Sequence, residues 1–250
     1  MKPFHFNIKY ALPLKRGERI DLDGGEARHI ARVLRLKTDS LVNLVNGIGG
    51  MTPARIVKIG KASVTFEIEA ETIIRDDRLP IELIVGIIKG ERMDWLIQKA
   101  TELGVSAIRP VLTRHTVVGL DDDKRYSRTT RWQEIAMQAL KQCKGLTSPS
   151  IYPVSTLSEA VLSVQASGTR LFLSESCDEK GIIQAWRQSD EPPATVAIGP
   201  EGGFSDEEQT MFKRSGFTPA SLGKRTLRSE TAAIAAIAVL GSLIYDIKTP

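Results

Sequence analysis

The sequence predicts an α/β protein of two domains, a small β-rich barrel over residues 1–75 and a larger α/β domain over residues 76–250. Two observations predict this division. Short β-branched runs punctuated by Gly, Asn and Pro fill the first part, whereas strands and helices alternate in the second. The charged segment 75–78, Arg-Asp-Asp-Arg, lies where the periodicity changes and is suited to a linker.

The first domain is expected to hold four strands joined by tight turns. The dipeptides Asn46-Gly47 and Gly49-Gly50 are typical of a hairpin, because they tolerate the positive φ angles that such turns need. The strands are expected at 18–22, 40–47, 53–60 and 62–71. Together these short strands indicate a small barrel.

A basic helix is expected inside this barrel, over residues 26–36. Ile30, Val33 and Leu34 recur at helical spacing and are expected to face inward. The other side is lined by basic residues without an acidic interruption, namely Arg28, Arg32, Arg35 and Lys37. Residues 1–75 hold 13 Lys/Arg against 8 Asp/Glu, so RNA phosphates are the expected partner of this face. A solvated basic face without a partner is the alternative.

Strands and helices are expected to alternate through the second domain. The expected strands are 81–88, 107–112, 151–154, 170–174, 195–199 and 219–223. The expected helices are 91–103, 131–143, one after a capping box of Thr156 and Glu159, one through Trp186, one from Asp206 after a capping box of Ser205 and Glu208, and a long C-terminal helix. This alternation predicts a mostly parallel sheet covered on both faces.

Two loops at the carboxyl ends of these strands carry residues suited to ligand binding. In residues 199–204, the glycines around Glu201 allow a ligand to touch the backbone, although a tight turn without a ligand is the alternative. In residues 222–231, Lys224, Arg225 and Arg228 precede a helix N-terminus, where the helix dipole disfavours cations unless they bind something. A solvated loop with Arg228 paired to Glu230 is the alternative there.

Several other classes of protein are disfavoured. Two cysteines, Cys143 and Cys177, and three scattered histidines offer no disulfide framework and no metal spacing, so no metal is expected. P-loop, dinucleotide-fingerprint and hydrolase-elbow motifs are missing. The opening residues lack the apolar core of a signal peptide, and the apolar run 232–245 is expected to be too short to span a bilayer, which predicts a cytoplasmic protein.

Taken together, the motifs strongly resemble those of the RsmE family of 16S rRNA methyltransferases. The resemblance rests on GPEGGFSDEE and SLGKRTLRSETAAIAA, with KGERMDWLIQKATELGVSAIRPVLTRHTVV and HIARVLRLKTDS upstream. It covers nearly the whole chain in the right order. Three positions depart from the family pattern, since Lys144 replaces an arginine, Lys224 replaces a proline and Arg28 replaces a histidine.

The resemblance implies a SPOUT methyltransferase domain with a C-terminal trefoil knot, preceded by a PUA-like barrel. It implies a homodimer that uses S-adenosylmethionine to methylate N3 of a uridine in 16S rRNA, within the 30S subunit or as free RNA. The cofactor-binding residues that it implies are Leu173, Ser174, Gly199, Pro200, Glu201, Gly202, Leu222, Gly223, Leu227 and Arg228. The RNA substrate that the resemblance implies is expected to contact the basic helix, with the target uridine at the strand-end loops.

For this reaction we expect Arg228 to stabilise the uridine anion, with Glu201 or Glu230 as proton acceptor. A bracing role is the alternative for Glu201, and structural roles are expected for His29 and His115. Two other functions stay open at this point. One is a related knotted methyltransferase acting on a ribose 2′-hydroxyl or a tRNA base, and the other is a non-catalytic RNA-binding or ribosome-assembly factor.

Overall fold

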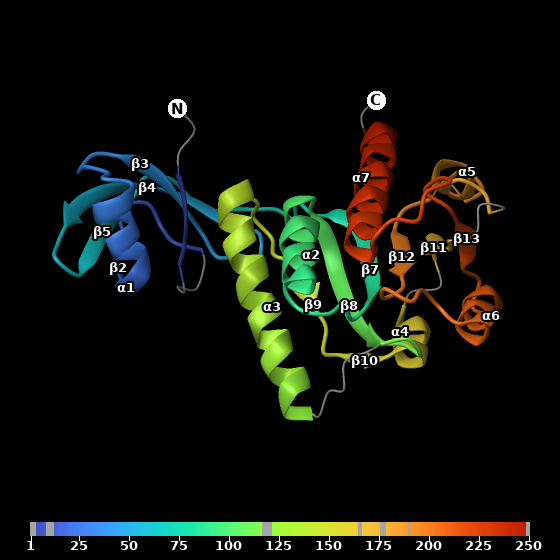
Figure 1. Cartoon of the computed structure of the whole chain (residues 1–250). Helices are drawn as coiled ribbons and strands as arrows, with labels where there is room; N and C mark the ends of the chain where they lie inside the picture. Colours follow the sequence, from blue (N-terminus) through green and yellow to red (C-terminus); the bar gives the residue numbers. More distant parts are fainter. Residues whose placement is uncertain are drawn as a thin grey trace. The chain divides into compact units, whose positions relative to one another are not determined.

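The computed structural model describes residues 4–8, 13–116, 122–164, 167–175, 179–189 and 191–248. Cys177 and the end of the motif TRHTVV therefore lie outside the described residues. The chain divides into two compact units. The first unit is residues 1–77 with 140–148, and the second unit is residues 78–139 with 149–250. Each unit has its own hydrophobic core, and Figure 1 shows the elements of each.

The first unit is built on one sheet of six strands. These are β1 (Phe4–Asn7), β2 (Arg19–Asp23), β3 (Leu41–Val45), β4 (Gly50–Ile59), β5 (Ser63–Ile68) and β6 (Ile73–Ile74). The strand order is β1-β3-β4-β5-β2, with β6 paired to β4. The four expected strands are confirmed as β2 to β5, and the expected hairpin joins β3 to β4 with Val45 opposite Met51. Alternate side chains such as Ile56 and Phe66 are buried, as period-two strands with one covered face require.

The basic helix is present but differs from its expected form. It begins as α1 (Gly24–Arg28) and continues as the π-helix η1 (His29–Val33), in which the Leu34 N–H donates to the His29 carbonyl at 3.0 Å. The wider π turn leaves Ile30 buried but turns Val33 outward, where it is 67% exposed. Arg35 has a φ of 49° and lies beyond the helix. The expectations that Val33 faces inward and that Arg28, Arg32 and Arg35 share one helical face were therefore wrong.

Residues 140–148 are anchored in the first unit by the segment expected to be a linker. The carboxylate of Asp77 accepts the backbone N–H groups of Leu146 and Thr147 at 2.8 and 3.0 Å. The Gly49 N–H in the β3–β4 hairpin donates to the Leu146 carbonyl at 3.0 Å. Lys141 also forms an ion pair with Glu26 of α1. Residues 140–148, which begin within the last turn of the helix Asp122–Cys143, thus belong to the first unit.

The second unit is built on one sheet of seven strands. These are β7 (Leu79–Gly86), β8 (Val105–Leu112), β9 (Ser150–Ile151), β10 (Ser155–Thr156), β11 (Thr169–Leu173), β12 (Ala194–Ile198) and β13 (Thr218–Ala220). The order is β10-β8-β7-β12-β11-β13 with β9 beside β8, and every strand pair is parallel. The expected parallel sheet is confirmed. The expected strand 151–154 is interrupted, because Pro153 lies between the short strands β9 and β10 and has no N–H for a ladder bond.

Helices cover both faces of this sheet, as expected. They are α2 (Glu91–Glu102), α3 (Asp122–Cys143), α4 (Leu157–Ser163), α5 (Ile182–Trp186), α6 (Asp206–Arg214) and α7 (Ser229–Lys248). Leu83 and Val85 of β7 join a core with α2, α3, α5 and α7, whereas Ile84 joins the opposite core with α4 and α6. Both expected capping boxes are present, at Thr156–Glu159 and Ser205–Glu208. Helix α3 begins well before the expected Arg131.

The C-terminal helix α7 is a core helix of the second unit. Its window Ser229–Asp246 has a mean hydropathy of 1.3 and is long and apolar enough to cross a membrane by length and composition. The expectation that this run is too short for a membrane was therefore wrong. In the fold, Ala233, Ile237 and Leu240 are buried in the core that covers β7 and β12. The small alanine side chains let the helix approach the sheet closely.

We predict that His5 makes the stability of the protein depend on pH. Burial lowers the pKa of His5, Lys144 lowers it further, and Asp77 opposes both effects. The unfolded chain, with an ordinary histidine pKa of about 6.5, therefore takes up a proton before the folded chain does, so stability falls as the pH drops below that value. Urea midpoints at pH 7.5 and 5.5 should differ less in His5→Gln than in the wild type. The exposed His29→Gln is the control, and an unchanged pH effect in His5→Gln contradicts the prediction.

Candidate active site

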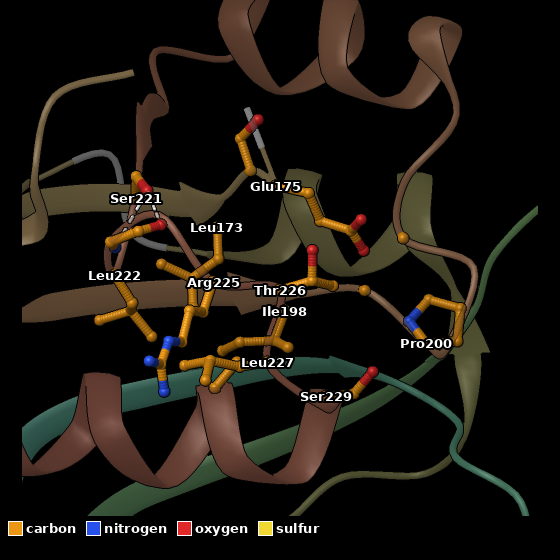
Figure 2. A pocket seen from close by; sticks show the side chains of 15 residues that line it. Leu173, Glu175, Ile198, Pro200, Ser221, Leu222, Arg225, Thr226, Leu227 and Ser229 are labelled. Atoms are coloured by element: carbon orange, nitrogen blue, oxygen red, sulfur yellow. Dashed lines mark hydrogen bonds between the residues drawn. The ribbon is translucent and has the colours of Figure 1, made fainter. Parts of the chain in front are cut away.

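The candidate active site is a pocket at the carboxyl edge of the parallel sheet in the second unit. Strands β12, β11 and β13 are neighbours, so the loops that follow them meet. A cavity of about 60 Å³ lies between these loops and the start of α7. The lining residues are Leu173, Ser174, Glu175, Ile198, Gly199, Pro200, Gly203, Ser221, Leu222, Gly223, Arg225, Thr226, Leu227, Ser229 and Ala232 (Figure 2).

Glycine allows the loop after β12 to fold tightly on itself. A Cβ at Gly199 would lie 2.8 Å from the carbonyl carbon of Gly203, which itself has a φ of 66°. On the neighbouring strand, a Cβ at Gly86 would lie 2.6 Å from the backbone nitrogen of Pro200. Because these contacts involve backbone atoms, a larger residue has nowhere to move. The loop therefore presents its main chain directly to the pocket.

Backbone hydrogen bonds join the other two loops. The Ser174 N–H after β11 donates to the carbonyl of Ala220 in β13 at 3.0 Å. The Ile182 N–H at the start of α5 donates to the Ser221 carbonyl at 2.9 Å. The Gly223 N–H donates to the Ser221 hydroxyl at 3.2 Å, and Gly223 has a φ of 125°. The loops thus form one connected wall.

The lining combines apolar side chains, exposed main chain and one charge of each sign. The apolar side chains are Leu173, Ile198, Leu222, Leu227 and Ala232. Figure 2 shows Arg225 beside Leu222 and Leu227, whereas Glu175 lies on the side of the pocket formed by the loop after β11. Apolar surfaces with a few polar groups suit a small ligand that has a flat apolar part and charged ends.

The structure brings together most of the residues that the sequence indicated for a cofactor. Leu173, Ser174, Gly199, Pro200, Leu222, Gly223 and Leu227 line the pocket, whereas Glu201, Gly202 and Arg228 do not. Sequence reasoning assigned no cofactor role to Glu175, Ile198, Gly203, Ser221, Arg225, Thr226, Ser229 and Ala232. Glu175 and Gly203 each lie next to a residue that was expected to bind the cofactor. The cluster of cations around Arg225 in the loop 222–231 could also have indicated that Arg225 lines the pocket.

Glu201 points away from the pocket and braces its loop. The carboxylate forms an ion pair with Arg92 of α2 at 2.6 Å and accepts the Lys89 N–H at 3.3 Å. These contacts join the loop after β12 to the loop after β7. Glu230, in the first turn of α7, is only 7% exposed, and its Oε2 has no hydrogen-bond partner in the described part of the chain. Both carboxylates thus lie beside the pocket rather than in it.

Arg228 lies at the rim, immediately before α7. Its carbonyl accepts the Ala232 N–H at 2.8 Å, which starts the helix, and its side chain is exposed. His115, after β8, has Nδ1 at 2.8 Å from the Gly202 carbonyl. A carbonyl only accepts hydrogen bonds, so this His115 nitrogen carries the proton and braces the loop. The expected structural role of His115 agrees with this geometry.

The basic residues of the first unit are exposed, namely Arg28, Arg32, Arg35 and Lys37. The Arg28 Nε donates to the Gly24 carbonyl at 3.3 Å. Among the ion pairs of the described residues, none involves any of these four cations. Their charges are therefore available to an anionic partner.

Comparisons with known proteins agree with this architecture. Residues 75–241 match the family of RNA methyltransferase domains, and residues 22–69 match RNA methyltransferase PUA domains. The parallel sheet, the pocket at its edge and these matches define an RNA methyltransferase of the SPOUT class with an N-terminal PUA domain. The class and the PUA domain confirm what the resemblance implied, whereas the trefoil knot stays a prediction.

The most informative relatives cover almost the whole chain. A ribosomal RNA small subunit methyltransferase E from Rickettsia conorii is 30% identical, over 94% of this chain and 95% of the relative. The crystal structure of the Neisseria gonorrhoeae methyltransferase E, bound to S-adenosyl methionine, is 32% identical with a TM-score of 0.84, over 97% and 98% of the two chains. The structure of a Legionella pneumophila methyltransferase with the same bound cofactor is 32% identical with a TM-score of 0.83, over 97% of this chain and 98% of that chain. The chain belongs to the RsmE family.

We predict that Gly199→Ala destabilises the protein by about 1–3 kcal/mol, because the added Cβ overlaps the backbone of Gly203. Gly181→Ala is the matched control, since its Cβ would meet nothing within 4 Å and its φ of −59° suits alanine. Urea unfolding of both variants tests this, and equal stabilities would contradict the proposed close packing of the loop.

Proposed function

We propose that this protein transfers the methyl group of S-adenosylmethionine to N3 of a uridine in the 16S rRNA of the small ribosomal subunit. The observation that carries the proposal is the pocket made by the three strand-end loops. Its lining unites bare main chain, apolar side chains and separated charges. The similarity of the whole chain to the cofactor-bound Neisseria gonorrhoeae enzyme supports the same assignment.

The lining fits this donor. The five apolar side chains can pack against the two faces of an adenine ring. The main-chain groups of the loops at Gly199 and Gly223 can form hydrogen bonds with the polar edge of the ring. The Arg225 guanidinium suits the carboxylate of the methionine part, because a planar fork pairs well with a carboxylate. When bound, the donor supplies an activated methyl group on a positively charged sulfur.

The chain must then make N3 of the uridine nucleophilic. N3 carries a proton, and its loss spreads negative charge onto O2 and O4, so a cation next to the ring favours the reactive anion. Arg228 fits this role because it is exposed at the rim, one residue before the pocket-lining Ser229. A role of Glu201 or Glu230 as the proton acceptor stays a prediction. For Glu201, the ion pair with Arg92 favours the alternative role of bracing the loop.

The wider assignment follows the same family. Residues 1–75 form the RNA-binding domain, in which Arg28, Arg32, Arg35 and Lys37 contact phosphates. Residues 76–250, apart from the segment 140–148 that packs with the first unit, form the catalytic domain with a C-terminal trefoil knot. The enzyme acts as a homodimer in the cytoplasm, on rRNA within the 30S subunit, without a metal. The meeting of the loops after β11, β12 and β13 supports the knotted topology, and the exposure of the four cations supports the RNA contact.

The decisive experiment is methyl transfer from S-adenosylmethionine to 30S subunits and to free 16S rRNA, both from cells that lack this protein. We expect a nucleoside methylated at N3 of uridine, which blocks base pairing and stops reverse transcription. Ribose methylation, which leaves pairing intact, would identify the related enzyme instead. Absence of both transfer and donor binding would identify a non-catalytic RNA-binding factor.

In the same assay we predict that Arg228→Ala lowers the turnover number by about 10²–10³, as loss of one stabilising group typically does. The affinity for S-adenosylmethionine should change by less than about threefold, because Arg228 lies outside the pocket lining. Arg214→Ala, an exposed arginine at the end of α6, is the control. Unchanged turnover in Arg228→Ala would remove the proposed role.

We also predict that replacing Arg28, Arg32 and Arg35 together by glutamine weakens RNA binding most strongly at low salt. Each lost phosphate contact should reduce the slope of log K against log salt by about 0.7–0.9. Filter binding of 16S rRNA across a salt series measures this slope. A triple variant of Arg16, Lys58 and Lys61, which are exposed cations of the same unit, should keep the wild-type slope. Equal slopes in both variants would contradict a specific basic surface.

A further inference from the structure

Glu175 is the one carboxylate among the described residues that line the pocket. It follows β11 and is exposed. Its Oε1 lies 3.5 Å from the position that a Cβ at Gly203 would occupy, so the carboxylate reaches the edge of the loop after β12 (Figure 2). Within the described parts of the chain, this carboxylate has neither a hydrogen bond nor an ion pair. Glu175 therefore offers a free negative charge to whatever the pocket binds.

Among the described residues, the three carboxylates Glu201, Glu208 and Glu230 lie near the pocket but outside its lining. Glu201 is paired with Arg92. Glu208 accepts the N–H groups of Ser205 and Arg114, both at 2.8 Å. Glu230 is buried outside the lining. Within the described lining, a cation that enters the pocket thus meets the carboxylate of Glu175 as its counter-charge.

Opposite charges lie on different sides of the pocket. Figure 2 shows Arg225 near Leu222 and Leu227 at the side of α7, and Glu175 on the far side, toward the loop after β12. Arg225, like Glu175, forms no ion pair within the described residues. The ligand that fits such a lining carries both signs of charge, separated by an apolar body. A sulfonium donor with a carboxylate at one end has this character.

We infer that Glu175 faces the sulfonium of the donor and makes the protein prefer the charged donor over the demethylated product. This inference rests on the proposed function. In the transfer, the N3 electron pair of the uridine anion forms the new N–C bond while the C–S bonding pair returns to sulfur. The sulfur thereby becomes a neutral thioether, and its attraction to Glu175 disappears. The carboxylate thus favours donor binding and product release, and contributes little to the transition state, in which the positive charge is already falling.

The experiment compares the affinities of the full-length protein for S-adenosylmethionine and S-adenosylhomocysteine by calorimetry. We expect Glu175→Gln to weaken binding of the charged donor about tenfold, as loss of a charged hydrogen-bond partner does, and to change binding of the neutral-sulfur product less than about twofold. Glu175→Asp, which keeps the charge, should retain most of the preference. Glu134→Gln, an exposed carboxylate on α3, is the isosteric control.

The outcomes separate the inference from the proposed function. An equal loss of affinity for both ligands, or no loss for either, overturns the role of Glu175. If the wild type transfers methyl groups to RNA while Glu175→Gln keeps the wild-type ratio of affinities, the inference fails and the proposed function stands. If the wild type binds neither ligand, the proposed function fails first. Thermal unfolding of each variant checks that the fold is intact, which the exposure of Glu175 leads us to expect.

Discussion

The parallel pairing of β12, β11 and β13 is the constraint on which the site depends. Parallel neighbours end at the same edge of a sheet, so the loops after these strands must meet there. The hydrogen bonds from Ser174 to Ala220 and from Ile182 to Ser221 then join two of the loops into one wall. Without this pairing, Gly199 and Leu227 would have no common pocket to line.

Helix α7 links this site to the core of the second unit. Its first turn supplies Ser229 and Ala232 to the pocket, while Ala233, Ile237 and Leu240 are packed against the sheet. Residues that line the pocket are therefore positioned by a helix that packs in the core of the unit. This arrangement keeps the lining rigid, because moving the helix would disrupt close-packed contacts along its whole length.

The charged residues of the protein fall into groups with different roles. Around the pocket, the carboxylates of Glu201 and Glu208 brace loops against α2 and the segment after β8, so they leave the pocket itself with few charges. Glu175 and Arg225 are the charges that remain inside it. The basic residues of the first unit carry no comparable pairing, which suits the recognition of an extended polyanion rather than of a small ligand.

The sequence by itself determined the features that depend on local interactions. The strands, both capping boxes and the glycine loop follow from periodicity and from residues a few positions apart. Most of the pocket-lining positions were indicated by the resemblance of the motifs to the RsmE family. The tertiary structure decided which charges face the pocket, because Glu201 meets the Lys89 N–H across 112 positions of the chain. It likewise decided that α7 is buried, that Val33 and Arg35 leave the expected helical face, and that Glu175 stays free. Long-range packing and a widened helical turn are not encoded in any short stretch of residues, so only the folded chain reveals them.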